Sequence, residues 1–368
     1  MDVTEIAKLY TTHGPFVSLY LNTPVAVENA AQRLDTAWRS TRKELLDAGA
    51  DEATVDALEA AVKDDRTEGN SVVAFASHGT LLYSRRLPEE LGRETALYGG
   101  LPYVTPLLSW RQTRVPHVVV LADRTGAEIL AYVDDSEPVV SEEVQGSHDV
   151  IRRVQPGGWS QLRYQHRAED SWEGNAREVV DEIDRVARSV DAQAILVGGD
   201  VHAVRLIAEH LPEQSKALVH VLEQGGGRAN DGGAPFTAAE VMDRMGGIAL
   251  ERLERILDEF QEERGQGDRA TDGVRATVEA IRKAQVATLL IHDDPDDDRM
   301  LWYADDPSLV ACDRSELDGL TDHCEQGRLA DVLIRAAVGT GADVVVVPSS
   351  GGSGIPNDGC GAILRYSD

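Results

Sequence analysis

Short apolar runs alternate with longer amphipathic stretches along the chain, and this alternation predicts a succession of strands and helices. In the first third, residues 16–21 form an apolar run typical of a strand, and residues 26–48 have a helical pattern. Two further apolar runs, residues 71–76 and 80–84, are separated by His78-Gly79. This spacing predicts a β-hairpin.

The middle third begins with strands and continues with alternating helices and strands. The predicted strands are residues 115–122, 126–133, 139–144, 194–199 and 217–222, and the predicted helices are residues 175–190 and 201–210. The order strand, helix, strand implies an α/β layer with some parallel pairing. A glycine-rich linker at residues 225–233 precedes a helix over residues 236–263, with an expected break at Gly246-Gly247.

The last third alternates again. It contains predicted helices at residues 272–284 and 328–340, and predicted strands at residues 286–291, 301–303, 343–347 and 359–366. This order predicts an α/β/α sandwich. We therefore expect a multi-domain α/β protein with domains at residues 1–112, 113–250 and 251–368.

Composition and charge change this picture in two ways. The chain of 368 residues is 42% hydrophobic but only 5% aromatic, so its cores consist mainly of aliphatic side chains. Its formal net charge of −28 argues against a general nucleic-acid-binding protein, which would carry a basic face. Three cysteines without metal-ligand spacing, and no secretion signal or long apolar run, predict a cytoplasmic protein that does not enter a membrane.

One stretch departs from the acidic character of the chain. Residues 151–167 contain four arginines and no carboxylate. Pro156-Gly157-Gly158 predicts a turn at its centre, with Trp159 at the tip. The candidate RNA-contacting residues of this loop are Arg152, Arg153, Gly157, Gly158, Trp159, Gln161, Arg163, Tyr164 and Arg167. The arginines suit phosphate contacts, and the aromatic side chains suit stacking on bases or packing against the middle sheet.

A second, smaller basic cluster lies in the first predicted long helix. Its candidate RNA-contacting residues are Trp38, Arg39, Arg42 and Lys43. They combine one aromatic ring with three cations, which is a composition that nucleic-acid-binding surfaces use.

Other motifs favour structural roles. Gly198-Gly199-Asp200 and the glycines at 351–354 follow predicted strands, but neither has the spacing of a nucleotide-binding loop, so tight turns are the favoured interpretation over phosphate binding. The acidic run at 293–298 favours a solvated loop over a cation site. No histidine spacing indicates a metal ligand set or a catalytic triad, and no cofactor is predicted.

The loop also resembles a known family. Gly157-Gly158-Trp159, followed by a polar helix, is similar to the Gly-Gly-Gln loop of the archaeo-eukaryotic class-1 peptide chain release factors and Pelota. The strand at residues 17–21 resembles the start of the family's decoding domain, and residues 359–366 resemble its C-terminal Gly-Gly-Ile-Leu-Arg-Tyr signature. The resemblance implies three domains in a tRNA-like arrangement, with a ribonuclease-H-like middle domain and a ribosomal-protein-like C-terminal domain.

The sequence departs from this family at both functional motifs. Release factors use the glutamine after the two glycines to place the hydrolytic water, and Trp159 stands there. An indole offers one N–H donor and no comparable acceptor. The decoding motif Asn-Ile-Lys-Ser is also absent from residues 29–50. The chain therefore resembles the bacterial branch of the family, which includes hibernation factors of the Balon type.

The resemblance predicts a ribosome-binding hibernation factor that occupies the A site of idle or stalled ribosomes, between 16S and 23S rRNA, without hydrolysing peptidyl-tRNA. It also implies that elongation factor Tu meets the C-terminal domain. The rival hypothesis is a rescue hydrolase in which Gln161 replaces the lost glutamine. An acidic stress protein acting away from ribosomes is a further alternative.

Overall fold

The computed structural model describes residues 4–23, 29–64, 69–123, 126–133, 138–145, 160–222, 238–292, 294, 296–348 and 356–367. Contacts between residues divide the chain into two compact units. One unit is the continuous segment Thr113–Glu251, and the other combines Met1–Gln112 with Arg252–Asp368.

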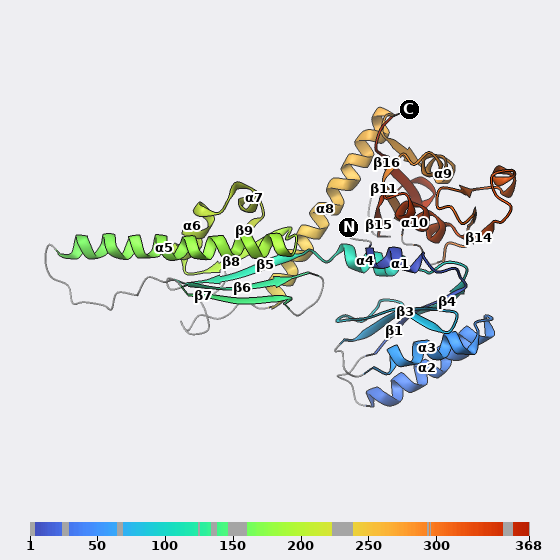
Figure 1. Ribbon diagram of the computed structural model, residues 1–368, viewed down its shortest axis with the longest axis horizontal. Helices are drawn as coiled ribbons and strands as arrows, with labels where there is room; N and C mark the ends of the chain where they lie inside the picture. The colour runs from blue at the N-terminus through green and yellow to red at the C-terminus, as the bar shows by residue number, and fades with distance from the viewer. Residues whose placement is uncertain are drawn as a thin grey trace. The chain divides into compact units, whose positions relative to one another are not determined.

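A five-stranded mixed sheet forms the centre of the Thr113–Glu251 unit (Figure 1). Its order is β7-β6-β5-β8-β9, with β5, β8 and β9 parallel and β6 antiparallel to both of its neighbours. This mixed order agrees with the α/β layer with some parallel pairing that the sequence predicted. The strands are β5 (His117–Ala122), β6 (Gly126–Tyr132), β7 (Val140–Gln145), β8 (Ala194–Gly199) and β9 (Val219–Val221).

Helices cover both faces of this sheet. Its helices are α5 (Ser160–Ser189), α6 (Val201–His210), α7 (Glu213–Lys216) and the first part of α8 (Ala238–Gln266). Val118 and Val120 of β5 pack with Ile183 of α5 on one face, whereas Val119 packs with Met245 of α8 on the other. Because the sheet is covered on both faces, the central strands β5 and β8 are nearly continuous apolar runs in the sequence.

The N-terminal segment carries a four-stranded antiparallel sheet of order β3-β2-β1-β4. Its strands are β1 (Phe16–Asn22), β2 (Ser71–Ser77), β3 (Thr80–Leu87) and β4 (Thr95–Gly99), and its helices are α1 (Thr4–Leu9), α2 (Ala30–Asp47), α3 (Glu52–Val62) and α4 (Thr105–Gln112). The predicted hairpin is confirmed, because His78 and Gly79 turn the chain with φ of 48° and 73°. Helices α2 and α3 pack on one face of the sheet.

The C-terminal segment is an α/β/α sandwich, as predicted. Its sheet has the order β10-β16-β11-β15, with α9 and α10 on one face and the second part of α8 on the other. These elements are β10 (Ala270–Asp272), α9 (Val274–Arg282), β11 (Val286–His292), α10 (Leu329–Gly339), β15 (Asp343–Val347) and β16 (Cys360–Leu364). The described residues of this segment also form a small sheet and two 3-10 helices: β12 (Met300–Tyr303), β13 (Val310–Ala311), β14 (Glu325–Arg328), η2 (Arg314–Leu317) and η4 (Asn357–Gly359).

The N-terminal and C-terminal segments share one hydrophobic core. Tyr20 and Phe75, on the sheet face opposite α2 and α3, belong to the same buried cluster as Leu333 of α10. The side-chain amide of Gln112 also donates to the Val346 carbonyl at 2.5 Å and accepts from the Val346 N–H at 2.9 Å. The first and third predicted segments therefore form a single packed unit.

Three details correct the sequence-based expectations. Helix α5 begins at Ser160 instead of Asn175, because nothing in the intervening sequence except Gly174 disfavours a helix. Helix α8 continues through Gly246-Gly247, since Met245 on one side of the pair is anchored in a core. Helix α4 was not predicted; its proline, Pro106, lies in the first turn, where a helix tolerates proline.

Candidate functional site

The glycine–tryptophan loop lies outside the described residues. This applies to Arg152, Arg153, Gly157, Gly158 and Trp159. The described chain resumes at Ser160, which is already the first residue of α5. The loop therefore connects directly to a helix of 30 residues.

The other four candidates of this stretch belong to the helix. The backbone of Gln161, Arg163, Tyr164 and Arg167 is helical, with Arg163 and Arg167 about one turn apart. Further along α5, Val179, Ile183 and Val186 are at most 2% exposed and fix the helix on the middle sheet. In Figure 1 the first turns of α5 extend beyond the ends of β6 and β7. The candidate stretch thus begins a helix whose later turns are anchored in a core.

The Gly198-Gly199-Asp200 turn has a structural role. Gly199 has φ of 126°, and a Cβ atom there would lie 1.9 Å from the Ala122 carbonyl oxygen. The Asp200 carboxylate accepts hydrogen bonds from the N–H groups of His202 and Ala203, and so caps α6. A negative side chain at this helix start disfavours a second anion.

The hollow beside this turn is also too small for a nucleotide. Asp123, Asn175 and His202 contribute to its lining, and it encloses about 20 Å³, which is room for a single water molecule. These observations agree with the tight-turn interpretation.

Helix α2 separates its four candidates into different environments. Trp38 is only 3% exposed and packs with Leu45 and the first sheet, so it cannot stack on RNA as predicted. The prediction failed because Trp38 shares the helix face of the core residues rather than that of the basic ones. Arg42 donates to the carboxylates of Glu52 and Asp56 at 2.9 Å, and these hydrogen bonds raise its pKa. Arg39 and Lys43 are exposed.

The C-terminal signature is a packing and capping motif. A Cβ atom at Gly361 would lie 2.9 Å from the ring of Phe260, so glycine lets α8 approach β16. The Arg365 guanidinium donates to the carbonyls of Ala284, Thr340 and Gly341, just beyond α9 and α10. A cation at these carbonyls also opposes the negative ends of both helix dipoles.

Other chemistry-bearing residues are engaged within the protein. In the acidic run, Asp296 pairs with Arg93 at 3.0 Å and Asp297 pairs with Arg299 at 2.6 Å. Burial raises the pKa of the Cys360 thiol to about 12, so it is a poor nucleophile.

The described residues contain neither a metal-binding cluster nor a membrane-spanning helix. No group of three metal-binding side chains in them could hold an ion. Likewise, none of the helices in this part of the chain is both long and apolar enough to span a membrane.

Comparison with known families finds a match in the middle of the chain. Residues 116–266 match the model of bacterial archaeo-eukaryotic release factor family 2. Over this segment the chain is similar to that family, and we call residues 116–266 the release factor segment. The release factor segment includes the five-stranded sheet, the Gly157-Gly158-Trp159 sequence, α5 and the whole of α8.

Similarity to individual proteins extends beyond the release factor segment. Two Mycobacterium tuberculosis proteins, the uncharacterized protein Rv2629 of strain H37Rv and the uncharacterized protein MT2704 of strain CDC 1551, are each 26% identical over 369 residues. These residues cover 98% of this chain and 95% of each relative.

Two known structures also give matches, each at low identity. S. cerevisiae Dom34, a translation termination-like factor that interacts with Hbs1, matches with a TM-score of 0.43 and 10% identity over 81% of each chain. Ribosome-bound archaeal Pelota, solved with ABCE1, matches with a TM-score of 0.39 and 13% identity over 100% of this chain and 94% of the other.

Proposed function

We propose that this protein binds the A site of idle or stalled ribosomes and blocks it without hydrolysing peptidyl-tRNA. The observation that carries the proposal is Trp159, which follows Gly157-Gly158 within the release factor segment. Hydrolysis needs a group that can both donate to and accept from a water molecule, as a glutamine amide does. The indole of Trp159 lacks the acceptor, but it can stack on an unpaired base.

Local positive charge supports the ribosome as the binding partner. The net charge of −28 makes general attraction to RNA unfavourable, so the contacts must come from defined basic positions. Arg152 and Arg153 precede the loop tip, and Arg39 and Lys43 are exposed on α2. We assign the first pair to 23S rRNA and the second pair to 16S rRNA.

The rival hypothesis makes the protein a hydrolase through Gln161. Gln161 is the second residue of α5. Moving it to the position after the two glycines would require a shift of two residues and loss of the first helical turn. This cost favours occlusion of the site over hydrolysis.

We also propose that elongation factor Tu binds the segment Arg252–Asp368. This assignment comes from the family resemblance alone. Pull-down of elongation factor Tu by the full chain tests it, and failure to bind in either nucleotide state of the GTPase would contradict it.

Co-sedimentation with 70S ribosomes over a range of salt concentrations tests the main proposal. We expect Arg152→Glu/Arg153→Glu to weaken binding by at least about tenfold, because two phosphate contacts are lost. The slope of log affinity against log salt should become less steep by about 1–2.

The matched control changes charge equally on exposed arginines that are not among the candidate RNA-contacting residues. Arg255→Glu/Arg314→Glu has the same net charge as the test variant. It should bind nearly as well as the wild-type protein. Equal weakening by both variants, or no binding of the wild-type protein to ribosomes, would contradict the proposal.

A further inference from the structure

Asp331 is a carboxyl group buried in the core shared by the two ends of the chain. It is the third residue of α10, is 3% exposed, and its Oδ1 atom has no hydrogen-bond partner. Burial raises the pKa of Asp331 to about 7, although the charge of Arg328 acts in the opposite direction. A buried carboxylate without a hydrogen-bonded partner is costly, so the neutral acid is favoured.

Two tyrosines from the N-terminal segment face this carboxyl group. Tyr10 follows α1, and Tyr20 lies on β1. Burial raises the pKa of both tyrosine hydroxyls, and the nearby Asp331 raises both further. The Tyr20 hydroxyl donates to the Tyr103 carbonyl at 2.7 Å, whereas the buried Tyr10 hydroxyl has no partner. Neither tyrosine therefore stabilises an ionised Asp331.

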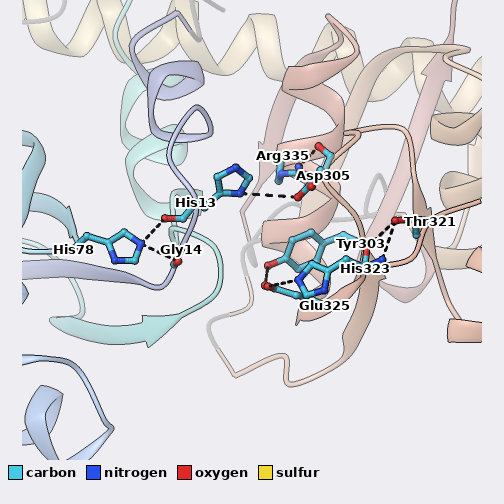
Figure 2. A network of polar contacts seen from close by, with 9 residues as sticks. All are labelled: His13, Gly14, His78, Tyr303, Asp305, Thr321, His323, Glu325 and Arg335. Carbon is cyan, nitrogen blue, oxygen red and sulfur yellow. Dashed lines mark hydrogen bonds and ion pairs between the residues drawn. The ribbon is translucent and has the colours of Figure 1, made fainter.

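Two arginines close to Asp331 in the sequence contact other groups. Arg335, one turn along α10, stacks over Tyr303 at 5.3 Å and donates to the Asp305 carbonyl at 2.6 Å (Figure 2). Arg328 stacks over Tyr103 at 4.6 Å and donates to the Asp297 carbonyl at 3.4 Å. Among the described residues, neither arginine donates a hydrogen bond to the Asp331 Oδ1 atom.

Asp331 therefore lies where the two segments of one unit meet. Its own helix belongs to Arg252–Asp368, and the tyrosines that face it belong to Met1–Gln112. We propose that Asp331 makes this packing proton-dependent: the neutral acid lets α10 pack against the N-terminal segment, and ionisation weakens that packing. Acidification would then stiffen the unit, and a more alkaline medium would loosen it.

The direction follows from the raised pKa. Because the folded pKa lies above the usual value of 3.8, the contribution of Asp331 to stability is largest below that value. It decreases as the pH rises and levels off above the folded pKa. Between pH 6 and pH 8, this single group should increase the opening equilibrium by about tenfold.

Hydrogen exchange of the full-length protein at pH 6 and pH 8, corrected for intrinsic exchange rates, measures this opening. Amides of β1 and α10 should lose about tenfold in protection at the higher pH in the wild-type protein. Asp331→Asn keeps the shape of the side chain but cannot ionise, so the loss of protection by about tenfold should be absent from this variant. Asp318→Asn, at an exposed carboxylate of the same unit, should behave as the wild-type protein does.

Asp331→Asn differs from the wild-type protein only at this carboxyl group. The contacts of His13 with Asp305 at 4.0 Å and of His323 with Glu325 at 3.4 Å are present in both proteins (Figure 2). Equal pH dependence in the wild-type protein and Asp331→Asn would overturn the proposal. If Asp331→Asn fails to fold, the chemical shift of the Asp331 carboxyl carbon in the wild-type protein is followed against pH instead. A midpoint near pH 7 supports the proposal, and a midpoint below pH 5 contradicts it. The test uses the free protein, so its outcome is independent of ribosome binding.

Discussion

At the scale of single residues, Trp38 and Arg39 are neighbours on α2 with different roles. Trp38 packs in the first core, whereas Arg39 is exposed. The sequence contained the signal for this difference, because Leu34, Trp38 and Leu45 share the helical spacing of a buried face. Composition alone groups Trp38 with its basic neighbours. The spacing of the apolar residues is what distinguishes the buried Trp38 from the exposed Arg39.

This difference predicts separate effects of two substitutions. Trp38→Ala should lower the free energy of unfolding by about 3–5 kcal/mol, because it leaves a large cavity. Arg39→Ala should change it by less than about 0.5 kcal/mol but weaken co-sedimentation with ribosomes. Denaturant unfolding of both variants checks the first effect. A stable Trp38→Ala variant with weakened ribosome binding would restore Trp38 as an RNA contact.

Buried polar residues are harder to predict from the sequence. Asp331 lies between Leu329 and a strongly apolar stretch of α10, so the helical pattern places it near the buried face. The first turn of a helix is nevertheless a favourable place for an exposed carboxylate. Only the packing of the N-terminal segment against α10 distinguishes the two environments. Arg365 is similar, since its three carbonyl partners lie far from it in sequence.

At the scale of elements, the apolar pattern predicted most strands and helices, but it placed two helices incorrectly. In α5 the pattern is clear only where Val179, Ile183 and Val186 face the sheet. The earlier turns lack that apolar stripe, so periodicity did not reveal them. In α8, Gly246-Gly247 suggested a break, but tertiary anchoring on both sides outweighs the low helix propensity of glycine.

The unbroken α8 predicts that alanine is preferred at both glycines. Among the described residues, no atom outside the neighbouring helix backbone lies within 4 Å of a Cβ atom built at Gly246 or Gly247. Each substitution to alanine should raise the free energy of unfolding by about 0.5–1 kcal/mol. Thermal or denaturant unfolding of Gly246→Ala/Gly247→Ala measures the change.

The matched comparison is a glycine that is packed closely. Gly361→Ala should destabilise the protein by about 1–3 kcal/mol, since the new methyl group meets Phe260. A loss of stability in Gly246→Ala/Gly247→Ala would show that α8 needs a bend at this position.

At the scale of the whole molecule, the sequence predicted α/β layers but not which segments share a core. All residues of β1 from Phe16 to Leu21 are buried, so this strand must be covered on both faces. The apolar pattern shows that other residues must cover the second face of β1. It cannot show that α10, far along the chain, is one of the elements that do so. The tRNA-like arrangement of domains stays a prediction of the family resemblance.

The central claim is that the protein occupies the ribosomal A site and performs no hydrolysis there. Its most direct test is the release of labelled peptide from peptidyl-tRNA on 70S ribosomes to which the protein is bound. We predict that the protein co-sediments with these ribosomes while release stays at the uncatalysed background. Codon-independent release by the wild-type protein that disappears in Gln161→Ala would contradict the claim.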